Sequence, residues 1–428
     1  MVRKTTLSNG IRIVTEQIPF VHSVSMGIWV NVGSRDESDP ERGITHFIEH
    51  MLFKGTERRS ALDIAKELDA VGGFANAFTS KENVCFHAKV LDTHLPLVVD
   101  VLTDLFLHST FAPDEIERER QVILQEISMI EDSPEDLVHI LFQQEFWKSH
   151  PLANPIYGTP ETVQALDRRM AVDYMARQFR PGKIVVAAAG NLEHDAFADL
   201  LGPALNSLNH SGSPAPRHSP LLHPHRQVVS KDLEQVHLCL GFPGCSHSDP
   251  DRFSCHVLNV VLGNSMSSRL FQEVRERRGL AYSVYSFVNS HEDTGLMGVY
   301  AAVAPTQVEE TLRVIQDQMA RIAAESITEA ELSAAKEYLK GSMYLNAEST
   351  DSRMNRLAKN EIVFGRHISF GEVEEQIDGV TTEDVRRWFE GAYRPEVTAV
   401  TLLGPVSEDV LDRCFPAAPS AAAAESSR

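Results

Sequence analysis

The residues of this sequence best suited to chemistry are His46, Glu49 and His50, in the stretch His46-Phe-Ile-Glu49-His50. Two histidines four positions apart lie about one turn apart on one side of a helix, so both imidazoles can reach a single metal ion. A carboxylate beside them can take a proton from a water molecule at such a site, which is the role of a general base. We therefore interpret the stretch as a metal site with Glu49 as its base.

The histidine spacing alone is weak evidence, because a sequence with 18 histidines contains such pairs by chance. The phase of the expected helix strengthens the interpretation. The apolar residues around the motif fall on one stripe of a helix with 3.6 residues per turn, namely Ile44, Phe47, Ile48, Met51 and Leu52. His46, Glu49 and His50 fall on the opposite side, where packing gives no reason for them.

A catalytic zinc site generally has three protein ligands and one open position, so a third ligand is expected. The predicted helix from Pro113 to Ile130 carries Glu119 and Glu126, seven positions apart on one side and flanking an apolar stripe. A half-buried flank suits a ligand, but glutamates in surface salt bridges would give the same pattern. The pattern leaves the choice open, and such ligands would also accept manganese or cobalt.

The surrounding sequence predicts an α+β fold. Residues 11–14, 23–32 and 183–189 read as strands, being rich in Val, Ile and other apolar residues. Helices are expected between the second and third of these strands, around 40–54, 61–70, 95–107, 113–131 and 134–147. The helices would pack on one face of a mainly antiparallel sheet.

A short repeat indicates that the chain contains two homologous domains. Phe179-Arg-Pro and Gly190 recur as Tyr393-Arg-Pro and Gly404, 214 positions later in each case and so half a chain length away. The position 214 after His46 is Val260, so the second copy has no metal motif there. We predict a zinc-binding domain at 1–208, a linker rich in Pro, Ser and Gly at 209–226, a second domain at 227–415 and a disordered tail at 416–428.

Composition limits the kinds of partner. A net charge of −20 argues against a nucleic-acid binder, and it favours basic peptides if the charge lines a cleft; general solubility would explain it equally well. Five scattered cysteines fit a reducing compartment. The sequence shows neither a signal peptide nor an apolar run long enough to cross a membrane, so we expect a cytoplasmic protein.

At this point the sequence resembles the pitrilysin/insulinase family of zinc peptidases, and most closely its bacterial members similar to mitochondrial processing peptidase. The order H-x-x-E-H is the inverzincin signature. The resemblance extends from Leu7 to about Pro405, and it is carried by four segments: Gly43 to Thr56, Asn76 to Ser80, Glu119 to Ile127 and Met266 to Ser283.

The resemblance implies roles for further residues. It makes Glu126 the third ligand of one zinc ion per chain and Glu119 a neighbour that tunes the site. Arg275 and Tyr282 match a pair that binds the substrate backbone near the scissile carbonyl. Without the resemblance, Arg275 would be read as a cation complementing a helix C-terminus.

The resemblance also implies how substrate is bound. Asn76, Ala77 and Phe78 match an edge strand that pairs with an extended peptide, although an ordinary strand and turn would look similar. Asp136 matches the first of two acidic positions that read an arginine near the cleavage point, but Ile140 stands at the second, so strict arginine recognition is not expected.

Together these features predict a zinc-dependent metalloendopeptidase that cleaves unfolded peptides or presequence-like segments inside a chamber formed by a homodimer. The main alternative is an inactive structural or core-type subunit of a heteromeric complex, which would be expected to carry a broken motif. Another kind of zinc hydrolase or zinc-binding module would not explain Arg275, Tyr282 or the duplication.

Overall fold

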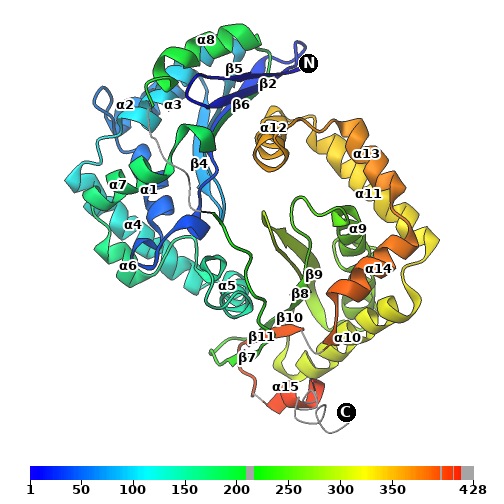
Figure 1. Ribbon diagram of the computed structural model, residues 1–428. Coiled ribbons are helices and arrows are strands. Elements are labelled where there is room, and N and C mark those ends of the chain that lie inside the picture. Colours follow the sequence, from blue (N-terminus) through cyan, green and yellow to red (C-terminus); the bar gives the residue numbers. More distant parts are fainter. Residues whose placement is uncertain (209–215, 396–397, 408, 416–428) are drawn as a thin grey trace, which may run out of the picture. The chain divides into compact units, whose positions relative to one another are not determined.

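The computed structural model describes residues 1–208, 216–395, 398–407 and 409–415 of the chain (Figure 1). The predicted tail at 416–428 and the part of the predicted linker at 209–215 lie outside the described residues. The chain forms two compact units. Unit 1 consists of Met1–Met129, Asn154–His218 and Ser342–Ser369, and unit 2 consists of Ile130–Ala153, Ser219–Gly341 and the chain from Phe370 onward.

Unit 1 is built on a six-stranded sheet. Its strands, in spatial order, are β1 (Val2–Thr6), β2 (Arg12–Gln17), β6 (Ile184–Gly190), β3 (Ser23–Val30), β5 (Val84–Leu91) and β4 (Phe74–Thr79). The pair β2/β6 is parallel and the other pairs are antiparallel. β3 and β6 are buried along almost their whole length, which fits strands covered on both faces.

Helices cover both faces of this sheet. Seven α-helices from the first half of the chain belong to unit 1: α1 (Ile44–Leu52), α2 (Ala61–Asp69), α3 (Leu95–His108), α4 (Pro113–Glu131), α6 (Pro160–Ala165), α7 (Arg168–Gln178) and α8 (His194–Leu205). They enclose the larger core against one face. The other face is covered by α12 (Thr350–Phe364), as Figure 1 shows.

Unit 2 has a five-stranded sheet. Its strands, in spatial order, are β7 (Arg226–Val229), β11 (Ala399–Leu403), β8 (Val236–Pro243), β10 (Gly295–Val303) and β9 (Ala281–Ser290). Its helical segments are α5 (Pro134–Phe146), α9 (Arg252–Leu262), the π-helix η6 (Phe271–Arg277), α10 (Val308–Glu325), most of α11 (Glu329–Asn346), α13 (Phe370–Gly379), α14 (Thr382–Ala392) and α15 (Asp409–Cys414).

The two sheets share one topology. The order β2-β6-β3-β5-β4 of unit 1 corresponds to β7-β11-β8-β10-β9 of unit 2. In each sheet the first of these pairs is parallel and the following pairs are antiparallel. The α+β class and the two related domains predicted from the sequence are thus confirmed.

The two halves of the chain exchange a helix. α5 comes from the first half but packs on β8 and β11 of unit 2, where Val138, Phe142 and Phe146 are buried. α12 comes from the second half but packs on β2, β3 and β6 of unit 1. The helices occupy corresponding places in the duplication, so each unit completes its sheet with a helix from the other half. The compact units therefore interleave the predicted segments 1–208 and 227–415.

Two further observations concern the cysteines and the length and polarity of the helices. All five cysteines are free and buried. Among the described residues, every helix is too short or too polar to cross a bilayer.

Candidate metal centre

Helix α1 presents the two histidines of the motif. It begins after Gly43, whose φ of 88° favours glycine, and a Cβ at this position would lie 2.6 Å from the carbonyl oxygen of Tyr157. The predicted apolar stripe is confirmed, since each of its five side chains is at most 1% exposed. His46 is buried, whereas Glu49 and His50 are half-buried.

Helix α4 brings two glutamates to the same place. Its apolar stripe of Ile116, Ile123 and Ile127 is buried, which fixes the rotation of the helix about its axis. Glu119 is buried on the flank of this stripe, and the Glu126 side chain is 42% exposed. Both glutamates reach α1, as the helical pattern allowed.

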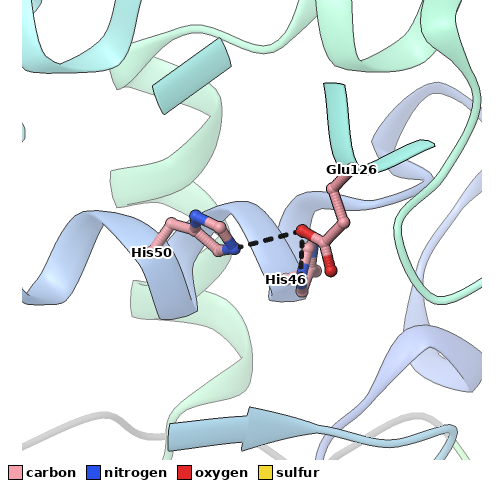
Figure 2. A group of neighbouring side chains, drawn as sticks. All are labelled: His46, His50 and Glu126. Atoms are coloured by element: carbon pink, nitrogen blue, oxygen red, sulfur yellow. Dashed lines mark ion pairs between the residues drawn. The ribbon is translucent and has the colours of Figure 1, made fainter. Parts of the chain in front are cut away.

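His46, His50 and Glu126 converge on one point (Figure 2). Glu126 Oε2 lies 3.7 Å from His46 Nε2 and 3.6 Å from His50 Nε2. One ligand atom from each residue lies within 4.8 Å of the other two. Among the described residues, this is the group of His, Cys, Asp or Glu side chains that could hold a metal ion.

Burial acts on His46, and a neighbouring carboxylate acts on His50. Burial, together with the nearby His50, lowers the pKa of His46 to about 3. His50 Nδ1 lies 3.1 Å from Glu119 Oε2, so an Nδ1 proton donates to that carboxylate and Nε2 keeps its lone pair toward Glu126. Lys54 Nζ lies 2.7 Å from Glu119 Oε1. Such a carboxylate partner is typical of metal-binding histidines.

Two imidazoles and a carboxylate form a ligand set that zinc accepts in catalytic sites. Glu119 sits behind His50, at the position of a residue that orients a ligand, whereas Glu126 faces both Nε2 atoms. The residues present therefore fit a zinc ion, and Glu126 lies where a third ligand could bind it.

Glu49 is held at the edge of the cluster by a residue to which sequence reasoning gave no role. Thr79, the last residue of β4, donates a hydrogen bond from Oγ1 to Glu49 Oε2 at 2.5 Å. Burial raises the pKa of Glu49 above its usual value, and the Thr79 hydrogen bond opposes part of that increase. Thr79 lies in the segment Asn76 to Ser80, which carries the resemblance, but the sequence does not show that it contacts Glu49.

The predicted peptide-pairing segment lies on β4, which is the last strand of its sheet. Ala77 is buried and pairs with Phe86, while Asn76 is exposed. The Phe78 ring packs edge-on against Trp29 at 5.3 Å between centroids. β4 therefore presents an edge whose outer backbone groups are directed away from the rest of the sheet.

Unit 2 brings Arg275 and Tyr282 together. Arg275 lies on the π-helix η6, and its guanidinium carbon is 4.5 Å from the centre of the Tyr282 ring. Arg275 Nη1 also donates to the carbonyl oxygen of Tyr282 at 3.1 Å. The Tyr282 side chain is 81% exposed, which is unusual for an aromatic residue on a strand. Single π-turns are frequent at functional sites.

Asp136 is exposed near the start of α5 in unit 2. Its Oδ2 accepts a hydrogen bond from Ser133 Oγ at 2.6 Å, so it takes part in capping that helix. Ile140 lies one turn further along, half-buried. The role predicted for Asp136 in substrate binding stays a prediction.

Comparisons with known proteins agree with the predicted family. Residues 12–160 match the family described as Insulinase (Peptidase family M16). Residues 165–339 match the family described as Peptidase M16 inactive domain.

Similar proteins occur in bacteria. An uncharacterized zinc protease of Bacillus subtilis is 42% identical over 90% of this chain and 94% of its own length. An uncharacterized zinc protease of Streptomyces coelicolor is 43% identical over 90% of this chain and 86% of its own. The solved structure of a peptidase M16 inactive domain from Pseudomonas fluorescens has the same fold, with a TM-score of 0.88, 20% identity and coverage of 95% of this chain and 98% of that one. The chain belongs to peptidase family M16, the insulinase family.

Proposed function

We propose that this protein is a zinc-dependent metalloendopeptidase that cleaves unfolded peptides. The observation that carries the proposal is the convergence of His46, His50 and Glu126, with Glu49 on the same helix as the two histidines. The names of the bacterial relatives, which call them zinc proteases, support it.

His46, His50 and Glu126 would hold the zinc ion. When bound at a site of this kind, zinc lowers the pKa of a coordinated water to about 7 and polarises a substrate carbonyl. Glu119 orients His50 through the hydrogen bond to Nδ1 and keeps its Nε2 available. Lys54 offsets the charge of Glu119.

Glu49 acts as the general base in this proposal. It takes the proton of the attacking water and later passes it to the nitrogen of the leaving amine. Partial burial raises its pKa above the usual value, which makes the carboxylate a stronger proton acceptor than an exposed glutamate. Thr79 fixes the orientation of the carboxylate for both transfers.

The edge of β4 binds the substrate backbone. An extended peptide can add a strand there through main-chain hydrogen bonds, using the segment Asn76–Phe78. Thr79 ends this strand and contacts Glu49, so a peptide paired with β4 runs toward the general base. A folded protein seldom offers a free extended segment, and this supports unfolded peptides as the substrate class.

Three residues of unit 2 are proposed to contact the substrate. Arg275 and Tyr282 present a guanidinium and a phenol as donors for a substrate carbonyl, and their mutual packing supports a joint role. Asp136 adds a negative charge, in keeping with basic or presequence-like substrates. A homodimer that encloses a chamber rests on the family resemblance, and analytical ultracentrifugation tests it.

The alternative of an inactive core-type subunit makes a different prediction about the metal centre. Such a subunit has no need of a complete ligand set, a general base and a residue that holds the base. All of these are present in one chain here, so the peptidase is the function that the site supports best.

A peptide-library experiment tests the proposal. A mixed library is digested with wild type, Glu49→Gln and Glu57→Gln, and the fragments are identified by mass spectrometry. Glu57 is an exposed glutamate just beyond α1 and serves as the matched control. We expect cleavage that a chelator abolishes and zinc restores, loss of at least about 100-fold in Glu49→Gln and no change in Glu57→Gln. Cleavage that resists the chelator, or survives in Glu49→Gln, would refute the mechanism.

A further inference from the structure

Glu37 is a buried carboxylate that the chemistry above does not use. Its side chain is almost fully enclosed, with only 5% of the residue exposed. Glu37 Oε2 accepts a hydrogen bond from the backbone N–H of Gly43 at 2.8 Å, and Oε1 accepts one from the N–H of Thr45 at 2.9 Å. Both carboxylate oxygens are therefore directed at the first turn of α1.

Helix α1 needs this contact because it has no capping side chain of its own. The N–H groups at the start of a helix have no partner within the helix, and a Ser, Thr, Asp or Asn at the N-cap usually satisfies one of them. Here the N-cap is Gly43, and its φ of 88° and the close Tyr157 carbonyl exclude a larger residue. Glu37 supplies the missing acceptors from outside the helix through its two side-chain oxygens. Burial raises the pKa of Glu37 to about 8, so the capping rests on these two contacts and not on a negative charge.

The segment that carries Glu37 is attached at its other end to the turn that follows β4. Ser34 donates its N–H to the carbonyl oxygen of Ser80 at 3.2 Å, and Arg35 donates its N–H to that of Lys81 at 2.8 Å. The Arg35 guanidinium forms a buried ion pair with Glu82 at 2.6 Å. Residues 33–37 thus connect the end of the edge strand to the start of α1.

The two ends of this connection meet again at the metal centre. The turn at 80–82 directly follows Thr79, which holds Glu49, and α1 carries both Glu49 and the histidine ligands. The position of α1 therefore affects two distances at once. One is the reach of Glu49 toward a peptide on β4, and the other is the reach of the histidines toward Glu126.

We propose that Glu37 is a positioning residue for the metal centre, because its carboxylate caps α1 and holds that helix in place against the end of β4. The proposal rests on the proposed function for its effect on catalysis. Its effect on the metal site stands on the contacts of unit 1 alone.

The test compares Glu37→Gln and Glu37→Asp with Thr381→Ala. Glutamine places an N–H2 group against one of the two backbone donors, and aspartate is one methylene too short to reach both. Thr381 caps α14 in unit 2 through a hydrogen bond from the N–H of Asp384 at 3.1 Å, so its loss removes a helix cap without touching unit 1. The Glu37→Asp variant keeps the carboxyl group and replaces Glu37→Gln if the latter does not fold.

Three properties are measured for each protein: zinc affinity by chelator competition, the visible absorption spectrum of the cobalt-substituted form, and kcat and KM on a peptide identified with wild type. We expect the Glu37 variants to bind zinc about tenfold or more weakly, to show an altered cobalt spectrum and to lose kcat with little change in KM. Thr381→Ala should lose thermal stability but keep all three properties.

A wild-type cobalt spectrum and zinc affinity in a folded Glu37 variant would overturn the proposal, even if that variant melts at a lower temperature. The same two measurements need no substrate. If wild type cleaves no peptide, the proposed function fails, while the spectrum and the affinity still decide the role of Glu37.

Discussion

Met354 gives the sharpest test of the helix exchange, because it lies in the second half of the sequence but is buried in unit 1. Its side chain is 0% exposed, and its Sδ accepts a hydrogen bond from Trp29 Nε1 at 3.4 Å. Met354→Ala removes buried atoms and leaves a cavity, which typically costs about 2–5 kcal/mol. It also leaves the Trp29 N–H without its acceptor, a further loss of about 1–3 kcal/mol. Because the two effects overlap, we expect unit 1 to lose about 3–5 kcal/mol of stability.

Met354→Leu separates the two effects. Leucine keeps most of the volume but cannot accept the hydrogen bond, so we expect a loss of about 1–2 kcal/mol. Met129→Ala is the control, since Met129 is also in unit 1 but is 73% exposed, and its truncation should change stability by less than about 0.5 kcal/mol.

Hydrogen exchange followed by mass spectrometry reads the effect strand by strand. In Met354→Ala we expect faster exchange in β3 and β6, against which α12 packs, and unchanged exchange in β8 and β10. Loss of protection in β8 and β10 with β3 and β6 unchanged would mean that α12 does not belong to unit 1 in solution, and the reasoning would fail.

Two further predictions concern single hydrogen-bonded groups. Thr79→Val removes the hydroxyl that holds Glu49, so it should lower kcat by about tenfold and change KM by less than about twofold. Thr79→Ser keeps the hydroxyl and should have kinetic constants near those of wild type. Equal kcat values for the two variants would contradict this role of Thr79. Burial alone would raise the pKa of Glu331, but the hydrogen bonds from Arg269 and the backbone lower it to about 2. A lowered pKa stabilises the fold above the unfolded value near 4.5, and this stability is lost as pH falls toward 2. Glu331→Gln should therefore cost about 1–2 kcal/mol at pH 7, after allowance for solvent screening. Urea unfolding should show the stability gap to wild type closing between about pH 5 and about pH 2. A gap that does not depend on pH would exclude the ion pair as its source.

The sequence predicted helix α1 and its buried face correctly because local periodicity determines both. The apolar stripe of α1 faces the core, and the histidines fall on the other side as helix geometry requires. The choice between Glu119 and Glu126 needed the family resemblance, because both flank the same stripe. The structure distinguishes them by contact, since Glu126 faces the two Nε2 atoms and Glu119 faces Nδ1 of His50.

Local sequence patterns did not predict the contacts of Glu37 and Thr79 or the exchange of helices. Glu37 and Thr79 act on α1 from positions whose contacts depend on how loops and strands meet, and neither stands in a helical register with the motif. The sequence indicates the exchange of α5 and α12 only in part. From the sequence we expected helices on one face of the sheet, but the strand at 184–190 is buried along its whole length because α12 covers the second face. Periodicity does not show which distant helix provides that cover.

The exchanged helix has a consequence for how the protein is made on the ribosome. The strands of unit 1 are complete in the sequence by Gly190, but α12 ends at Phe364. At about 5–20 residues per second, synthesis of the intervening chain takes roughly 10–35 s. Throughout that interval α12 does not yet cover Trp29, Val185 and the other apolar residues on this face of the sheet. The nascent chain thus presents a flat apolar surface for chaperones to shield, and a truncation before α12 would leave that surface permanently open.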